Sequence, residues 1–165
     1  MIQVDGLISK HRTNGLLVDA NLLVLYLVGK TNKRRIPAFK RTQQYTIEDF
    51  ELLEILVSQF ERMLTTPHLL TEASNLAALQ ADELGILRGV FKEMVGGMEE
   101  FYDESRSVVA DTAFARLGLT DAAIATLCRR SMLVLTDDLQ LHLALVNRGA
   151  DSINFNHIRT FFWHS

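Results

Sequence analysis

Short apolar runs alternate with longer amphipathic segments along the chain. Residues 15–19 form an apolar run that ends in an aspartate, and comparable runs recur at 132–136 and 152–155. Runs of this length predict buried strands. A further apolar run at 22–28 follows the first strand without a turn residue. We therefore expect a helix there that packs on the sheet and ends at Gly29.

Helical periods fill the segments between these strands. The predicted helices begin near 46 and then cover 67–79, 82–95, 104–117, the segment from 121, and 138–148. Thr46 and Asp49 resemble a capping box before the first of these helices. Pro67 and Gly118 are typical of a helix start and a helix end. With a short strand added near 63–65, strands separated by helices predict a parallel sheet covered on both faces.

The chain of 165 residues shows no internal repeat and no break in composition, which predicts one helix-rich α/β domain over 1–165. Cys128 is the only cysteine, so the sequence excludes an intrachain disulfide and a cysteine-cluster metal site. The longest apolar run, 22–28, is far shorter than the roughly 20 residues of a membrane helix. We therefore expect a cytoplasmic protein that does not enter a membrane.

Basic residues are concentrated in one segment. The net charge is −3, yet residues 20–47 include no acidic residue. The six basic residues of this segment are Lys30, Lys33, Arg34, Arg35, Lys40 and Arg41. Pro37 and the lack of a hydrophobic period predict an exposed loop over 30–45, in which Phe39 and Tyr45 could stack on unpaired bases. We expect this loop to bind RNA phosphates, and a purely solvated surface is the alternative.

Carboxylates lie where a parallel sheet opens a crevice, at the carboxyl ends of its strands. Asp19 ends the first strand, and Asp137 and Asp138 follow a later one. Asp121 and Glu72 each lie near the start of a helix. Single aspartates at such places often cap turns or helices, but capping does not require that all these acids face one crevice. Since neighbouring side chains diverge, we expect Asp138 to point inward and Asp137 to be exposed.

A cluster of carboxylates is unfavourable unless a cation neutralises it, because like charges raise one another's pKa values. The five histidines have no ligand-like spacing, and oxygen ligands alone select Mg²⁺ or Mn²⁺ over zinc. Such an ion can assist the attack of water on a phosphate group. The acids therefore predict metal-assisted hydrolysis of phosphodiesters.

Four segments resemble the successive signatures of PIN-domain ribonucleases. They are 17–21 (LVDAN), 66–72 (TPHLLTE), 118–124 (GLTDAAI) and 134–138 (VLTDD), and the resemblance covers about 15–153. It implies a three-layer α/β/α fold with a short-stranded parallel sheet. It also implies an endoribonuclease that depends on Mg²⁺ or Mn²⁺.

The resemblance also implies roles for individual residues. The catalytic acids would be Asp19, Glu72, Asp121 and Asp138; the first, third and fourth of them would hold the metal, and Asn21 and Thr136 would support them. Many PIN-domain proteins carry a further acid at the position of Gln140 in this chain, so the resemblance leaves open whether the site holds one metal ion or two. The basic segment 30–45 looks like an enlargement of the first loop of the small toxin nucleases in this family.

Other functions stay open at this stage. A PIN-like module that binds RNA or assembles with partners without cleaving it is the main alternative. A phosphatase of small phosphoesters is disfavoured, because the aspartate expected two residues after Asp19 is Asn21. If the chain is a toxin, an antitoxin protein is an expected partner, and a second copy of the chain is another.

Overall fold

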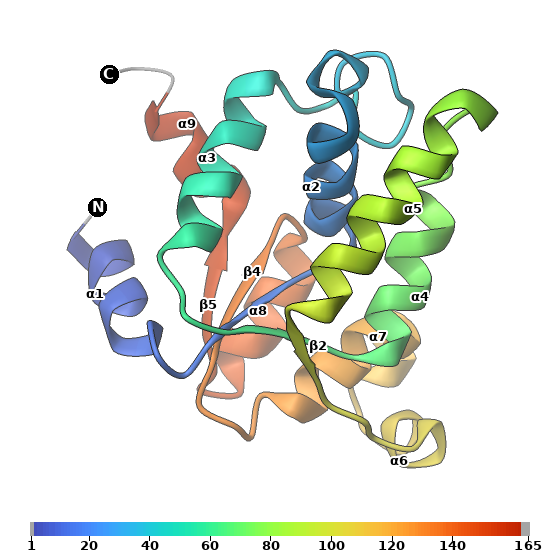
Figure 1. Ribbon diagram of the computed structural model, residues 1–165. Helices are drawn as coiled ribbons and strands as arrows, with labels where there is room; N and C mark the ends of the chain where they lie inside the picture. Colours follow the sequence, from blue (N-terminus) through green and yellow to red (C-terminus); the bar gives the residue numbers. More distant parts are fainter. Residues whose placement is uncertain (1, 163–165) are drawn as a thin grey trace.

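The computed structural model describes residues 2–162 and shows a parallel sheet with helices on both sides (Figure 1). The strands are β1 (Leu16–Val18), β2 (Met63–Thr65), β3 (Met98–Glu100), β4 (Leu133–Thr136) and β5 (Asp151–Asn154). The helices are α1 (Ile2–His11), α2 (Ala20–Asn32), a 3₁₀ turn η1 (Lys33–Arg35), α3 (Ile47–Ser58), α4 (Pro67–Leu76), α5 (Ala81–Gly96), α6 (Ser105–Val109), α7 (Phe114–Leu127), α8 (Leu139–Asn147) and α9 (Phe155–Phe162).

The strand order is β3-β2-β1-β4-β5, and every neighbouring pair is parallel. Leu17 of β1 pairs with Leu64 of β2 on one side and with Val134 of β4 on the other. From β1 the chain first builds outward through β2 and β3, and it then crosses back to add β4 and β5. The connections therefore change direction between β1 and β4, which is the topological switch point of the sheet.

The helices form two groups. Helix α2 packs on α3, α4 and α5, whereas α7 packs on α6 and α8. Crossovers between parallel strands are right-handed, so the connections that run in opposite directions from β1 place their helices on opposite faces of the sheet. The arrangement is consistent with a three-layer α/β/α fold. Among residues 2–162, no helix has the length and apolar character needed to cross a membrane.

Most predicted elements are confirmed. The strands β1, β2, β4 and β5 lie where the apolar runs predict them. Thr46 and Asp49 form both hydrogen bonds of the capping box of α3, and Pro67 begins α4 behind the Thr66 cap. Gly118 has a φ of 81° and interrupts the helical path of α7, as expected of a residue that ends one helical segment and precedes another.

Three predictions about elements are wrong. Helix α2 continues past Gly29 to Asn32, and 30–45 is not an exposed loop, because it includes η1 and buries Ile36, Thr42 and Tyr45. The segment 104–117 is not one helix but contains α6 and the start of α7. In addition, the structure contains an edge strand, β3, that is not among the predicted strands.

Gly29 lies inside α2, where the packing of a neighbouring helix leaves no room for a side chain. A Cβ atom at this position would overlap the ring of Phe50 on α3, and both residues are buried. Glycine therefore lets α2 and α3 approach closely at this point, even though its helix propensity is low.

We expect Gly29→Ala to destabilise the protein by about 1–3 kcal/mol, because overpacking displaces the Phe50 ring. For a chain of this size, each kcal/mol lowers the melting temperature by roughly 2–4 °C. Gly89→Ala in α5 is the matched control, since a Cβ atom there meets nothing within 4 Å and alanine favours the helix. A melting temperature that rises in both variants would show that the helices can separate without cost.

Candidate functional site

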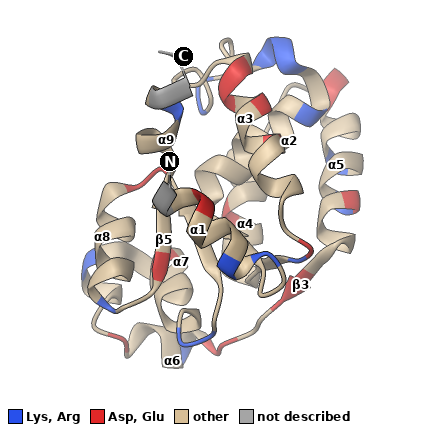
Figure 2. Ribbon diagram, turned by 90° about the vertical axis from the view of Figure 1, so that its left-hand side faces the viewer, with Lys and Arg blue, Asp and Glu red and all other residues tan. Residues whose placement is uncertain are grey.

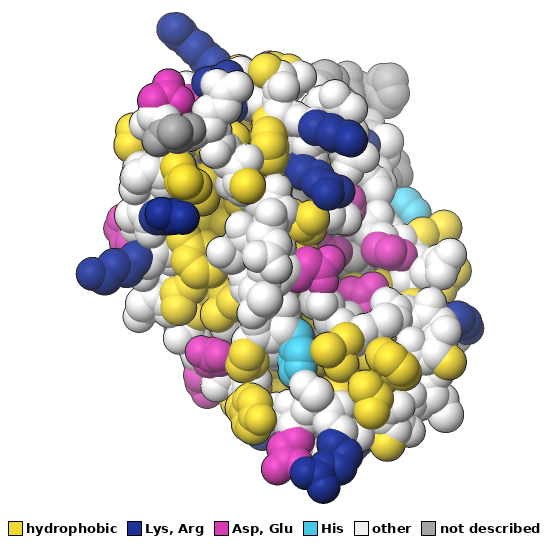
Figure 3. All heavy atoms as spheres, turned by 90° about the vertical axis from the view of Figure 1, so that its right-hand side faces the viewer, with side chains coloured by type: hydrophobic (Ala, Val, Ile, Leu, Met, Phe, Trp, Pro, Cys, Tyr) yellow, Lys and Arg dark blue, Asp and Glu magenta, His cyan; other side chains and the backbone are white. Residues whose placement is uncertain are grey.

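The predicted acids lie at the carboxyl ends of β1 and β4, at the switch point of the sheet. Asp19 follows β1 directly, and Asp137 and Asp138 follow Thr136, the last residue of β4. Glu72 lies on α4 and Asp121 on α7, two helices that pack on each other. Figure 3 shows acidic side chains gathered in the middle of one face, with lysine and arginine side chains directly above them.

Asp19 is fixed by three hydrogen bonds and is only 4% exposed. Its Oδ1 atom accepts from the backbone N–H of Leu22 at 3.2 Å, which caps α2. Its Oδ2 atom accepts from the Thr136 hydroxyl and, at 3.2 Å, from the backbone N–H of Asp137. Thr136 thus contacts Asp19 directly, and the supporting role implied for this hydroxyl stays a prediction.

The pKa of Asp19 is raised to about 8, mainly by burial and then by the charge of Asp137. The hydrogen bonds from Thr136 and Leu22 oppose this rise, and the charge of Asp121 adds to it. The carboxylate is therefore held in place in an environment that disfavours its charge.

Asp121 lies on α7, three residues after the interruption at Gly118. Its pKa is raised to about 7, first by burial and then by the charges of Asp138, Glu72 and Asp137, in that order. Electrostatic effects of this kind require that the groups lie near one another. The structure therefore brings together the four acids that the sequence predicts, and it adds Asp137 to them.

Asp138 is exposed and has a structural task of its own. Its Oδ1 atom accepts from the backbone N–H groups of Gln140 at 2.6 Å and Leu141 at 3.1 Å, which caps α8. Its own N–H donates to the Thr136 hydroxyl oxygen at 2.9 Å. The same threonine therefore orients both Asp19 and the backbone of Asp138.

The prediction that Asp137 is the exposed partner of Asp138 is wrong. Asp137 is half-buried, its Oδ1 atom accepts from the Asn21 side-chain amide at 3.2 Å, and its Oδ2 atom accepts from the Tyr45 hydroxyl. Strand alternation does not apply here, because β4 ends at Thr136 and Asp137 lies in the bend that follows. Asn21 accordingly supports Asp137 rather than Asp19.

The five acids have no cationic partner within the described part of the chain. None of the ion pairs among residues 2–162 includes Asp19, Glu72, Asp121, Asp137 or Asp138. An all-oxygen donor set of this kind suits Mg²⁺ or Mn²⁺. In the same residues, no group of three or more His, Cys, Asp or Glu side chains is arranged to hold a metal ion. Direct ligation by one or two carboxylates, with water in the other positions, is common for Mg²⁺ and is compatible with this open arrangement.

Half of the basic segment is neutralised by acidic neighbours. Lys30 pairs with Glu54 at 2.7 Å and Lys33 with Glu51 at 3.0 Å, both on α3, and Arg35 pairs with Glu83 on α5. Figure 2 shows basic segments beside acidic segments of α3 and α5. Three of the six predicted RNA-binding cations therefore stabilise contacts between helices, which sequence alone could not distinguish from a free basic surface.

The remaining cations are available to a ligand. Arg34, Lys40 and Arg41 are exposed, and none of them forms an ion pair with another residue in 2–162. The expectation that Tyr45 stacks on an unpaired base is wrong, because its side chain is buried and its hydroxyl donates to Asp137. Phe39 is partly buried and packs against the core. The segment can therefore attract phosphates, but its aromatic residues serve the fold.

No protein-family model and no curated protein matches the sequence. The resemblance to PIN-domain ribonucleases therefore stays a prediction. It rests on the four sequence segments, whose acids meet at one edge of the sheet.

Proposed function

We propose that this protein is a divalent-cation-dependent endoribonuclease of PIN type. The observation that carries the proposal is the meeting of carboxylates from β1, α4, α7 and the end of β4 at the switch point, with no basic side chain paired to them in residues 2–162. Unpaired clusters of this kind are costly for the fold and are typical of functional sites. The same chain also exposes Arg34, Lys40 and Arg41, whose positive charges attract the phosphates of RNA.

In the proposed mechanism, Asp19, Asp121 and Asp138 would surround the cation, one or two of them as direct ligands and the others through bound water, and Glu72 would accept a proton from the attacking water. Thr136 keeps the Asp19 carboxylate in one orientation. A bound Mg²⁺ or Mn²⁺ ion would stabilise the charge that develops on the phosphate and favour deprotonation of water. No covalent intermediate with the protein is needed, because positioning and electrostatic stabilisation supply the catalysis.

The proposal is tested with purified protein and an end-labelled single-stranded RNA. We expect internal cleavage in Mg²⁺ or Mn²⁺, no cleavage after addition of a chelator, and recovery when the cation is restored. Intact RNA under all cation conditions would reject the proposed activity.

The open arrangement of the acids also favours the alternative function, an RNA-binding or assembly module that does not cleave. No three of them are arranged to hold one metal ion within residues 2–162. Such a module would bind RNA with the same dependence on the basic residues and would leave it intact with every cation. An antitoxin and a second copy of the chain stay predicted partners under either function.

We expect the triple variant Arg34→Ser, Lys40→Ser, Arg41→Ser to weaken RNA binding and to flatten its dependence on salt. The slope of log affinity against log salt should fall by about 0.7 for each phosphate contact that a single strand loses. The cleavage rate at saturating RNA should stay the same, because these residues attract the substrate and perform no chemistry. Fluorescence anisotropy with labelled RNA at several salt concentrations measures the slope.

The matched control changes Arg88, Lys92 and Arg129 to serine. These three residues are also exposed, form no ion pair with another residue in 2–162, and lie on α5 and just after α7. The control removes the same total charge, so equal losses of affinity in the two triple variants would mean that net charge alone, and no particular surface, attracts RNA.

A further inference from the structure

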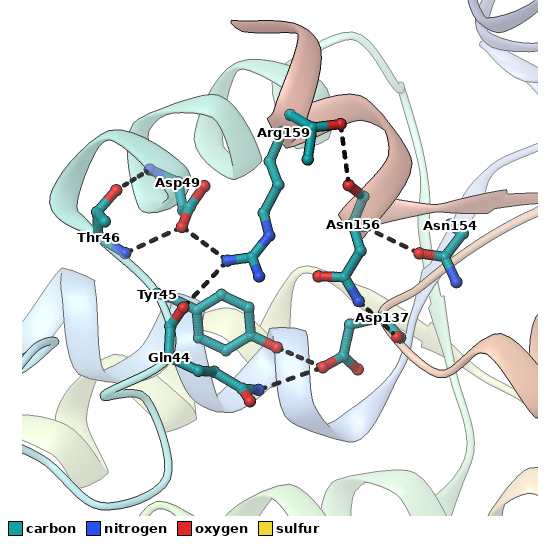
Figure 4. A network of polar contacts seen from close by, with 9 residues as sticks. Gln44, Tyr45, Thr46, Asp49, Asp137, Asn154, Asn156 and Arg159 are labelled. Carbon is teal, nitrogen blue, oxygen red and sulfur yellow. Dashed lines mark hydrogen bonds and ion pairs between the residues drawn. The ribbon is translucent and has the colours of Figure 1, made fainter. Parts of the chain in front are cut away.

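The side chain of Asp137 is held toward the site by residues from two other parts of the chain. The hydroxyl of Tyr45, in the segment before α3, donates a hydrogen bond to Oδ2 (Figure 4). The side-chain amide of Asn21 on α2 donates a hydrogen bond to Oδ1. Gln44 adds a longer contact to Oδ2 at 3.5 Å. Asn156 on α9 fixes the backbone, because its side-chain amide donates to the Asp137 carbonyl at 2.9 Å. Both the main chain and the carboxylate of Asp137 are thus oriented.

Tyr45 is itself fixed in place. Its side chain is only 2% exposed, and its ring contacts the ring of Phe155 edge to face at 6.4 Å. The guanidinium of Arg159 lies 5.4 Å from the centre of the Tyr45 ring. The hydroxyl of such a tightly packed ring can move little, so it defines where the Asp137 carboxylate lies.

Arg159 connects this tyrosine to the start of α3. Its guanidinium donates to the Gln44 carbonyl at 3.1 Å and to Asp49 Oδ2 at 3.0 Å (Figure 4). Asp49 is only 1% exposed and forms the capping box of α3 with Thr46. Helices α3 and α9, which lie far apart in sequence, therefore meet in one polar network that ends on Asp137.

The hydrogen bonds that Asp137 accepts from Tyr45 and Asn21 account for its orientation, but its negative charge has an electrostatic cost at this position. A buried tyrosine hydroxyl needs only one acceptor, and a neutral amide or carbonyl oxygen would serve it without repulsion from Asp19. A carboxylate beside Asp19 and Asp121, with no ion pair to a basic residue in 2–162, adds like charge instead. The extra charge is explained if a cation binds there.

We propose that Asp137 is a fifth acid of the site, which acts on the bound cation together with Asp19, and that Tyr45 is the positioning residue that aims it. The inference rests on the proposed function, because it assigns Asp137 to the cation site of that function. Tyr45 touches no substrate in this account and acts only through the Asp137 carboxylate.

The test measures Mn²⁺ affinity by calorimetry and RNA cleavage with the full-length chain. We expect Asp137→Asn to weaken Mn²⁺ binding by at least about 10-fold and to lower kcat by a similar or larger factor. Tyr45→Phe keeps the ring and removes only the hydroxyl, and it should weaken Mn²⁺ binding about 10-fold and lower kcat without changing KM for RNA. Tyr26→Phe is the matched control, since the Tyr26 hydroxyl has no hydrogen-bond partner among residues 2–162 and its ring packs on Phe50.

A structural role gives a different result: Tyr45→Phe would melt at a lower temperature while its Mn²⁺ affinity and kcat equal those of the wild type. That result overturns the positioning role of Tyr45, and wild-type Mn²⁺ affinity in Asp137→Asn overturns the assignment of Asp137. If the wild type binds Mn²⁺ but cuts no RNA, the proposed function fails, and the Mn²⁺ affinities of the variants still decide the inference. If the wild type binds no Mn²⁺, the inference is wrong.

Discussion

Replacement of Asp121 by asparagine should lower the rate of RNA cleavage by at least about 100-fold and leave the fold intact. Loss of a residue behind the metal ligands typically costs 10- to 100-fold, so loss of a ligand should cost at least the upper value. Asp121 accepts no hydrogen bond from the residues in 2–162, and asparagine has the same shape, so the change removes little besides the charge. Single-turnover cleavage of a labelled RNA measures the rate, and circular dichroism checks the fold.

Asp82→Asn provides the control for this variant. Asp82 is exposed in the first turn of α5, and it does not contribute to the raised pKa of Asp19 or of Asp121. The Asp82→Asn variant should cleave RNA at the wild-type rate. Wild-type cleavage by Asp121→Asn, once contaminating nuclease has been excluded, would remove Asp121 from the catalytic site.

The same substitution should stabilise the cation-free protein at pH 8. The pKa of Asp121 is about 7 in the folded protein and 3.8 as its ordinary value, so the folded state binds more protons than the unfolded state between these pH values. The free energy of unfolding of the wild type therefore falls as the pH rises from about 4 to 7, and the loss is complete above pH 7. Asparagine carries no charge and avoids this loss.

We expect Asp121→Asn to raise the free energy of unfolding at pH 8 by at least about 1 kcal/mol, which corresponds to an increase of roughly 2–4 °C in melting temperature. The difference from the wild type should shrink as the pH falls towards 4 and disappear near about pH 3, where Asp121 is protonated in both states. Mg²⁺ should raise the melting temperature of the wild type at pH 8 more than that of the variant, because a ligand that binds only the folded state stabilises it. If the variant and the wild type melt at equal temperatures at pH 8 as well as near about pH 3, with or without Mg²⁺, then neither burial nor neighbouring charge raises the pKa of Asp121 in solution.

The sequence predicts the central part of the sheet well. Apolar runs in β1 and β4 are buried on both faces, which leaves a strong local signal, and caps such as Thr46 and Thr66 mark the helices that follow. Strand β3 carries no such signal, since two of the three residues in its sequence MEE are charged and only its pairing with β2 makes it a strand. Helix α1 is missed for another reason: Val4, Leu7 and Ile8 stand at helical spacing, but the segment lies outside the alternation of strands and helices on which the prediction rests.

The site is predictable as far as it depends on residue type and order. Asp19, Asp121 and Asp138 could be selected because the carboxyl ends of strands and the starts of helices can be recognised in sequence. The direction of Asp137 could not be predicted, since it depends on Tyr45, which lies 92 residues earlier in the chain. The pairing of Lys30 and Lys33 with acids of α3 likewise depends on how two helices pack. Contacts between distant segments thus decide which of the predicted residues face a ligand.

The measurement that tests the central claim most directly is the analysis of the ends of RNA cut by the wild-type protein in Mg²⁺ and ¹⁸O-labelled water. Hydrolysis assisted by the carboxylate site places a solvent oxygen in the terminal phosphate. It also stops with chelator and with Asp121→Asn. Attack by the ribose 2′-hydroxyl instead leaves a 2′,3′-cyclic phosphate without solvent oxygen. We predict labelled phosphate ends that form only with the cation and with Asp121 present; uncut RNA, cyclic phosphate ends, or cutting that persists with chelator would contradict the account.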